Sequence, residues 1–411
     1  MYGCLCRVAG EVPKCGKGGA ASFYGILLCM QLFSPAKVNL SLAVSDVRAD
    51  GYHDLDSVVT LVTLGDDVFL ERRREGVSLE MICEGVEAAG LPGDVERNLA
   101  VRAVRLLERE MGRQLPTAIR IVKRIPLGGG LGGGSSNAAT VLKGVNALWE
   151  LGLPPERLCV LGAELGSDVP LFLLDGTVRM RGRGERVERL AMTGAPSMWL
   201  VLVNDGTHCP TPQVYRALDA LRTPPEARHE EKTQLPVECA EKDLTARGDL
   251  CDTLHLFLRK GDVRNVARWV QNDLETPCFQ QFPKVGAVAG RLKAAGCEGV
   301  LLCGSGATVC GFVGSREEGE RVLAHPALAE CRRAIVQTLP DGVMAAHGSL
   351  EPFVLVRVQV GEPGKAGLAA RLLFIFLFIF ANRMRFAHMT DFVSFAQNSP
   401  AFLSSETGRI A

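Results

Sequence analysis

The chain has 411 residues, of which 47% are hydrophobic and 22% charged, so it is long enough to bury a large core in two or three domains. Its 46 basic and 46 acidic residues give a formal net charge of zero, which excludes an overall basic field that would recruit nucleic acid. The composition favours a globular protein that acts on small molecules, with no nucleic-acid partner.

The fourteen cysteines and seven histidines are scattered along the chain. Cys159, Cys297, Cys303 and Cys310 lie among apolar residues, and no Cys-x-x-Cys pair occurs. A zinc site or a thiol redox motif is therefore not expected. A reducing cytoplasm is the predicted compartment.

Residues 1–29 form an extension that does not have the pattern of a domain. Lys14 and Lys17 precede an apolar run over residues 20–29, which has the outline of a short signal peptide. No suitable cleavage site follows, and a strand pattern begins directly at Met30. A start codon assigned too far upstream explains the extension better, with Met30 as the working N-terminus.

A strand with an interruption at Pro35 is predicted over residues 33–44. Its alternation places Lys37 and Asn39 on the same face of the sheet. An isolated lysine in such a position is most often an ordinary solvated side chain, so the pattern alone assigns Lys37 no role. Two further strands, around residues 58–62 and 67–71, continue the predicted sheet, and a helix is predicted over residues 94–111.

A turn on Asp50 and Gly51 separates the first two of these strands. Tyr52 and His53 follow it directly, so an aromatic ring and an imidazole lie side by side. Together they could stack on a nucleobase and hydrogen-bond to its edge. Taken alone, a histidine such as His53 is more often a surface residue or a hydrogen-bonded core residue than a ligand-binding one.

Residues 126–139 contain six glycines within seven positions, which allows positive φ angles and brings backbone N–H groups close to a ligand. An alternating strand pattern over residues 117–125 precedes this glycine loop, and helical spacing follows it until Gly152. Ser135 or Ser136 is the expected N-cap of that helix. A strand, a glycine loop and a helix start in series form an anion site.

Two common glycine motifs do not fit this loop. Gly128, Gly130 and Gly133 satisfy the dinucleotide fingerprint, but the acidic strand end that it needs about 20 residues later is replaced by a helix entry at residues 154–156. The Walker motif requires a lysine, which residues 134–136 lack. A flexible linker is disfavoured because the loop joins a strand to an amphipathic helix.

The rest of the chain predicts a short helix over residues 154–166 and then Asp168, which by itself is most simply a cap or turn residue. Residues after Ala195 form a second domain. Its expected elements are a strand at 199–203, helices at 263–274 and 284–295, and a tight glycine turn at 304–307 between strands at 300–303 and 308–313.

Five of these segments, taken in order, resemble the GHMP small-molecule kinases, and among them the kinases of 4-diphosphocytidyl-2-C-methyl-D-erythritol in the non-mevalonate isoprenoid pathway. The segments are residues 34–40 (SPAKVNL), 50–53 (DGYH), 126–139 (PLGGGLGGGSSNAA), 166–170 (GSDVP) and 302–308 (LCGSGAT). The resemblance covers about residues 30–333. It implies an α+β fold with an N-terminal ATP-binding domain at 30–194, a C-terminal domain at 195–339 and an active site in the cleft between them.

The resemblance also implies roles for individual residues. Lys37 and Asp168 form the catalytic pair, in which the aspartate accepts the proton of a substrate hydroxyl as it attacks the γ-phosphate of ATP. The ATP-binding residues are Pro126, Leu127, Gly128, Gly129, Gly130, Leu131, Gly132, Gly133, Gly134, Ser135 and Ser136. The substrate-binding residues are Asn39, Tyr52, His53, Thr211, Tyr215, Gly304, Ser305 and Gly306. Mg²⁺ is expected with ATP, and the sequence does not identify its protein ligands.

Tyr215 is the implied ring partner of Tyr52 around the cytosine of a cytidine-diphosphate substrate. The alternative, an amphipathic aromatic residue on a helix that begins near Pro212, stays open. Other readings also stay open, namely a mevalonate- or homoserine-type kinase of the same superfamily, a nucleotide-binding protein without catalysis, or an interaction protein tethered to a membrane through its tail.

Residues 340–411 form an atypical tail whose order the sequence leaves open. Its apolar run at residues 372–381 is too short to cross a bilayer, so no membrane partner is expected. The sequence does not distinguish a monomer from a homodimer.

Overall fold

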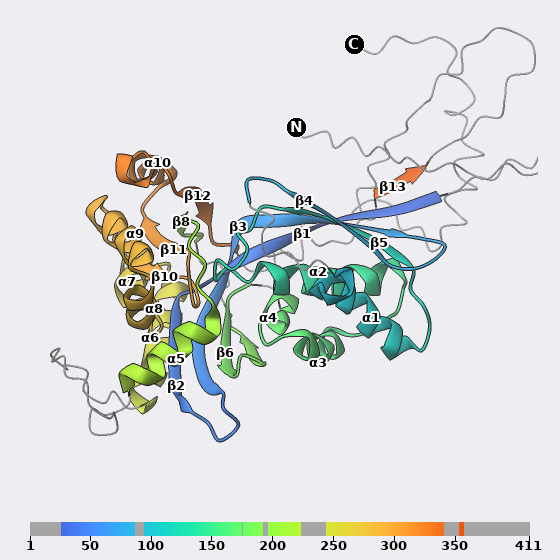
Figure 1. The fold of residues 1–411 in the computed structure, drawn as a ribbon, viewed down its shortest axis with the longest axis horizontal. Coiled ribbons are helices and arrows are strands. Elements are labelled where there is room, and N and C mark those ends of the chain that lie inside the picture. Colours follow the sequence, from blue (N-terminus) through green and yellow to red (C-terminus); the bar gives the residue numbers. More distant parts are fainter. Residues whose placement is uncertain are drawn as a thin grey trace, which may run out of the picture.

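A computed structural model describes residues 26–86, 94–174, 176–191, 196–222, 244–340 and 353–356. The fold has two halves, each built from a sheet and helices (Figure 1). The first holds a nine-stranded sheet with helices α1 to α4, and the second a four-stranded antiparallel sheet with helices α5 to α10. The predicted α+β class is confirmed.

The sheet of the first half contains β1 (Ile26–Asn39), β2 (Ser41–Val47), β3 (His53–Arg72), β4 (Ser78–Cys83), β5 (Thr117–Lys123), β6 (Val178–Gly182), β7 (Arg186–Arg189), β9 (Gln271–Asn272) and β13 (Phe353–Val356). Its helices are the 3₁₀ turn η1 (Val95–Arg97) and α1 (Leu99–Met111), α2 (Gly133–Leu148), α3 (Pro155–Leu165) and α4 (Val169–Leu173).

Strand β3 organises this sheet. It pairs antiparallel with β1 along most of its length, with β2 and β6 near its start and with β5 near its end. The two strands predicted at 58–62 and 67–71 are therefore one continuous strand. The strand can continue through position 65 because this residue is glycine. A Cβ there would lie 2.3 Å from the ring of Phe33 on the neighbouring strand.

Strand β1 is not interrupted at Pro35, contrary to the prediction. The strand continues to Asn39, and its register with β3 shifts between Pro35 and Ala36. Such an irregularity accommodates a residue that has no N–H for the ladder. The alternation beyond it is kept, so Lys37 and Asn39 do share a face.

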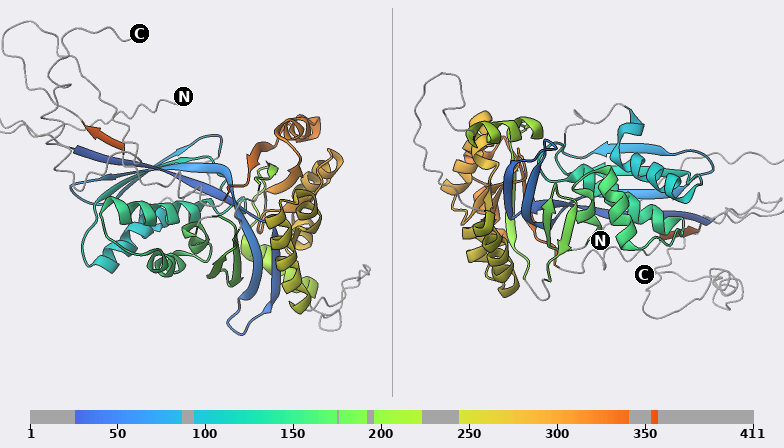
Figure 2. Two further views of the ribbon diagram at one scale, coloured as in Figure 1. Left: turned by 180° about the vertical axis from the view of Figure 1, so that it is seen from behind. Right: turned by 90° about the horizontal axis from the view of Figure 1, so that it is seen from below.

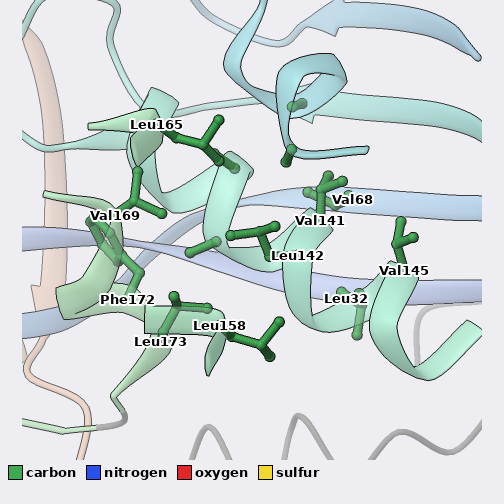
Figure 3. Close-up of a cluster of buried hydrophobic side chains, with 14 of the residues drawn as sticks. Leu32, Val68, Val141, Leu142, Val145, Leu158, Leu165, Val169, Phe172 and Leu173 are labelled. Carbon is green, nitrogen blue, oxygen red and sulfur yellow. The ribbon is translucent and has the colours of Figure 1, made fainter. Parts of the chain in front are cut away.

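Helices α1 to α4 cover one face of the sheet, as the two further views in Figure 2 also show. Figure 3 shows the contact between α2 and its surroundings, where Val141, Leu142 and Val145 meet side chains from the strands and from α3 and α4. Each fully buried side chain of this kind contributes about 1.5–3 kcal/mol. This core fixes the position of α2, and with it the glycine loop that precedes the helix.

The second half has the strand order β10 (Val300–Leu302), β11 (Val309–Val313), β8 (Trp199–Asn204) and β12 (Arg332–Gln337). Its helices are α5 (Thr211–Arg222), α6 (Leu244–Lys260), α7 (Val263–Trp269), α8 (Glu275–Gln281), α9 (Pro283–Ala294) and α10 (Arg316–Leu323), and the 3₁₀ turn η3 (Pro326–Leu328) follows. Strands β10 and β11 form the predicted hairpin around the second glycine turn.

The two halves are joined by backbone pairing. Strand β9 runs parallel to β2, and Leu339 N donates to Leu61 O at 2.8 Å. The predicted C-terminal end of the helix over residues 263–274 is therefore wrong. Helix α7 stops at Trp269, and the next residues, Gln271 and Asn272, pair with β2 instead.

Both ends of the described chain meet at one edge of the large sheet. Strand β1 begins at Ile26, four residues before Met30, and its first four residues pair with β13. The rest of the predicted extension and most of the tail, including the apolar run at 372–381, lie outside the described residues. Within the described ranges, no helix is long and apolar enough to cross a membrane.

Candidate active site

The glycine loop adopts the conformation that its composition predicts. Gly128, Gly130 and Gly132 have φ angles of 64°, 75° and 70°, a region that residues with a Cβ rarely occupy. Together with Leu99 and Lys123, the loop lines a pocket of about 220 Å³. The start of α2 faces this pocket, so the pocket suits phosphate groups.

The cap of α2 differs from the prediction. Helix α2 begins at Gly133 with Gly132 as its N-cap, which places Ser135 and Ser136 inside the first turn. The left-handed conformation of Gly132 lets the helix begin earlier than a serine cap would allow. Ser136 instead pairs its hydroxyl with that of Ser34 at 2.8 Å.

The glycine loop contacts the second glycine turn across the junction of the two halves. A Cβ on Gly130 would lie 1.9 Å from the carbonyl oxygen of Cys303, so only glycine fits there. Thr308 N donates to Gly129 O at 3.3 Å. A Cβ on Gly304 would lie 3.2 Å from Lys37 Nζ, which brings the predicted catalytic lysine to the same point.

Lys37 is held on β1 by contacts on both sides. Its backbone N–H donates to Leu131 O at 3.0 Å, and its Nζ donates to Asn39 Oδ1 at 2.5 Å. Asn39 Nδ2 in turn donates to Ser57 Oγ at 2.8 Å. Only 5% of Lys37 is exposed, so this ammonium is a positioned charge and not a solvated side chain.

Asp168 occupies the N-cap position of α4, but its side chain makes no capping bond. No described residue donates a hydrogen bond to its carboxylate, which is half-buried. Phe172, on the next turn of α4, packs against Gly132, which also contacts Lys37. The short helix therefore packs against the glycine loop through Phe172, and the carboxylate of Asp168 at its start is available.

Tyr215 on α5 lies near Asp168. Burial raises the pKa of the Tyr215 hydroxyl, and the negative charge of Asp168 raises it further. The Tyr215 ring lies 5.1 Å from that of His53, at an interplanar angle of 47°. His53 Nε2 contacts Asp219 Oδ1, one helical turn further along α5, at 2.8 Å.

The predicted stacking of Tyr52 and Tyr215 on the two faces of a cytosine stays a prediction, and in the structure each ring has another neighbour. Tyr52 follows the predicted turn, is 56% exposed, and has the guanidinium of Arg183 5.1 Å from its ring centroid. Tyr215 has His53 as its ring neighbour. Thr211 and Ser305 are brought together, with their hydroxyl oxygens 2.8 Å apart.

A buried ion pair beneath the glycine loop was not expected from the sequence. Lys123 Nζ donates to Asp66 Oδ2 at 2.5 Å, and Asn137 Nδ2 donates to the same oxygen at 2.9 Å. Asp66 Oδ1 accepts from the backbone N–H groups of the two residues after Lys123. This carboxylate therefore ties the end of β5 to the first turn of α2, on both sides of the loop.

The desolvation of Lys123 lowers its pKa, and Asp66 opposes this shift. The alternation of residues along the strands did not predict this ion pair, because Asp66 and Lys123 are 57 positions apart in the chain. Asp219 and Arg183 were missed for the same reason, because their partners come from other elements of the fold.

Comparison with known proteins agrees with this architecture. The family described as GHMP kinases N terminal domain matches residues 98–176, and GHMP kinases C terminal matches residues 254–326. A solved homoserine kinase from Cytophaga hutchinsonii is 19% identical, with a TM-score of 0.57 over 76% of this chain and 95% of that one, which shows a shared fold.

Curated relatives are more similar in sequence. The 4-diphosphocytidyl-2-C-methyl-D-erythritol kinase of Shouchella clausii is 36% identical over 70% of this chain and 87% of the relative, and that of Moorella thermoacetica is 38% identical over 70% and 90%. A crystal structure of 4-(cytidine 5'-diphospho)-2C-methyl-D-erythritol kinase is 33% identical, with a TM-score of 0.58 over 75% of this chain and 98% of that one.

The chain belongs to the GHMP kinases and, within them, to the family of 4-diphosphocytidyl-2-C-methyl-D-erythritol kinases. It is an ATP-dependent small-molecule kinase, as the sequence motifs predicted.

Proposed function

We propose that the protein transfers the γ-phosphate of ATP to a hydroxyl on the methylerythritol part of 4-diphosphocytidyl-2-C-methyl-D-erythritol, giving the 2-phosphate. The observation that carries this proposal is the meeting of the glycine loop, the buried Lys37 and the second glycine turn, together with the unengaged carboxylate of Asp168 at the start of α4, a helix that packs against the loop through Phe172. The similarity to 4-diphosphocytidyl-2-C-methyl-D-erythritol kinases supports the choice of substrate.

In this mechanism Asp168 is the general base. Its carboxylate accepts the proton of the substrate hydroxyl while that oxygen forms a bond to the γ-phosphorus and the bond to ADP breaks. Lys37 is close enough to the loop to offset negative charge on the transferring group. Its hydrogen bond to Asn39 keeps the ammonium oriented before the substrate arrives.

ATP phosphates bind the glycine loop through its backbone N–H groups and the start of α2. Within the described residues, no cluster of three His, Cys, Asp or Glu side chains could hold a metal alone. Mg²⁺ in kinases needs only one or two protein ligands beside phosphate and water, so a site for the ion that accompanies ATP does not require such a cluster. When bound, Mg²⁺ would neutralise part of the phosphate charge.

The cytidine end of the substrate binds beside Tyr52, His53 and Tyr215. His53 is held by Asp219 and by the Tyr215 ring, so its imidazole is fixed for contact with a base edge. Tyr52 is exposed and has one ring face available for stacking or for closing over the ligand. The substrate of a small-alcohol kinase has no base, so such an enzyme would not need these aromatic side chains for substrate binding.

The cysteine side chains that the structure describes are all free thiols, which supports a reducing compartment and a cytoplasmic location.

We propose residues 30–194 and 195–339 as the two domains.

The test measures the release of ADP from ATP by the full chain, with each of three acceptors in turn. We expect turnover with 4-diphosphocytidyl-2-C-methyl-D-erythritol and little with mevalonate or homoserine. Preferential turnover of a small alcohol would assign the protein to another activity of the superfamily. ATP binding without turnover of any acceptor would indicate a non-catalytic protein.

A further inference from the structure

The turn between β6 and β7 carries an arginine that the sequence motifs did not single out. Arg183 lies between Gly182 and Gly184, whose φ angles are 70° and 107°. A Cβ on Gly184 would lie 3.3 Å from Ser167 Cβ. The turn therefore packs directly against the residue that precedes Asp168.

The side chain of Arg183 extends toward the other end of the site. Its guanidinium carbon lies 5.1 Å from the centroid of the Tyr52 ring. Arginine stacks favourably on aromatic rings and keeps its N–H groups directed outward in the plane of the guanidinium. Arg183 thus connects the turn that carries Tyr52 with the segment that carries Asp168.

The guanidinium of Arg183 forms no ion pair with a carboxylate among the described residues, although Glu185 accepts a hydrogen bond from its backbone N–H at 2.7 Å, whereas its neighbours on the same hairpin are paired through their side chains. Arg179 contacts Asp56 at 2.7 Å, and Arg181 contacts Glu188 at 2.7 Å. Arg183 is exposed, and among the described residues its guanidinium has the Tyr52 ring as a neighbour and makes no side-chain hydrogen bond or ion pair. Its N–H groups are therefore available to an anion.

We propose that Arg183 binds the diphosphate of the cytidine-diphosphate substrate, an inference that rests on the function proposed above. In that substrate the diphosphate joins the cytidine to the methylerythritol that carries the reacting hydroxyl. With the base beside Tyr52 and the hydroxyl beside Asp168, the diphosphate must lie between them, where Arg183 extends. The guanidinium forms bidentate hydrogen bonds to phosphate oxygens, which a lysine does not reproduce.

Kinetics of the full chain distinguish this role from a structural one. Arg183→Ala should raise the KM for 4-diphosphocytidyl-2-C-methyl-D-erythritol about tenfold or more, because hydrogen bonds to charged groups are worth about that factor. The KM for ATP should stay unchanged and kcat should change little. The KM of Arg183→Lys for the same cytidylyl substrate should lie between the values for the wild type and for Arg183→Ala.

Arg181→Ala is the matched control. It removes the same charge from the same hairpin, but Arg181 is paired with Glu188. We expect its KM for the substrate to stay within about twofold of the wild-type value. An equal increase in both alanine variants would overturn the proposal, because it would indicate a general effect of charge.

Calorimetric binding of cytidine and of cytidine diphosphate isolates the diphosphate. Arg183→Ala should weaken cytidine diphosphate about tenfold and leave cytidine unchanged. Equal losses for the two ligands would overturn the proposal and show that Arg183 only supports the Tyr52 ring. An active wild type with an unaffected Arg183→Ala variant would overturn this inference alone. A wild type that does not phosphorylate the substrate would overturn the proposed function, and this inference with it.

Discussion

Removing the charge of Asp66 should destabilise the protein strongly. Asp66 is completely buried, and its oxygens accept hydrogen bonds from Lys123, Asn137 and two backbone N–H groups. Asp66→Asn keeps the size and one acceptor oxygen, but it leaves the buried ammonium of Lys123 without its carboxylate. Breaking one partner of a buried pair costs about 3–5 kcal/mol of unfolding free energy.

The loss of unfolding free energy in Asp66→Asn should depend on pH. Burial lowers the pKa of Lys123 and Asp66 opposes this, so the variant lowers that pKa further in the folded state. In the unfolded chain the lysine stays protonated up to its ordinary pKa of about 10.4. The unfolded variant then binds more protons than the folded one, so its free energy of unfolding rises with pH between the folded and unfolded pKa values, by at most about 1.4 kcal/mol per pH unit.

Urea unfolding at about pH 7 and about pH 9.5 tests this for the wild type, Asp66→Asn, Lys123→Met and the double variant. We expect the deficit of Asp66→Asn to be smaller at the higher pH. The double variant should be more stable than Asp66→Asn, because no uncompensated charge remains buried. A deficit below about 1 kcal/mol at pH 7, or one that does not change with pH, would refute the reasoning.

Three further predictions concern catalysis and the chain ends. Asp168→Asn and Lys37→Ala should each lower kcat about a hundredfold or more with little change in ATP binding, and near-normal turnover of a folded Asp168→Asn protein would contradict its role. Tyr52→Ala should raise the KM for the cytidylyl substrate by a factor equivalent to about 1–3 kcal/mol and leave that for ATP unchanged, whereas equal changes would point to a structural role. A chain trimmed to residues 30–339 should keep its kcat, measured by ADP release. Lost activity would show that the β1–β13 pairing is needed.

Local patterns in the sequence predicted the centre of the site. The strand over residues 117–123, the glycine loop and helix α2 follow each other in the chain, so their periodicity and glycine content indicate them directly. The shared face of Lys37 and Asn39 follows from the two-residue period of a strand, and a hydrogen bond between their side chains confirms it.

Other features depended on pairing between distant segments. The segment around Gln271 continues a helical pattern, but it becomes β9 because it pairs with β2. The N-cap of α2 is Gly132 and not a serine, since the backbone of the loop is fixed by its contacts with β1 and the second glycine turn. Local propensity is too weak to oppose such contacts.

The sequence by itself determined the glycine loop and the strand that carries Lys37, because these depend on residues close together in the chain, while its resemblance to the GHMP kinases implied the α+β class. Only the tertiary structure decided which side chains meet across the site. Asp66 pairs with Lys123, His53 with Asp219, and Arg183 with Tyr52 over separations of 57, 166 and 131 positions. The register of the sheet and the packing of α5 set these contacts, and neither is encoded in a local pattern.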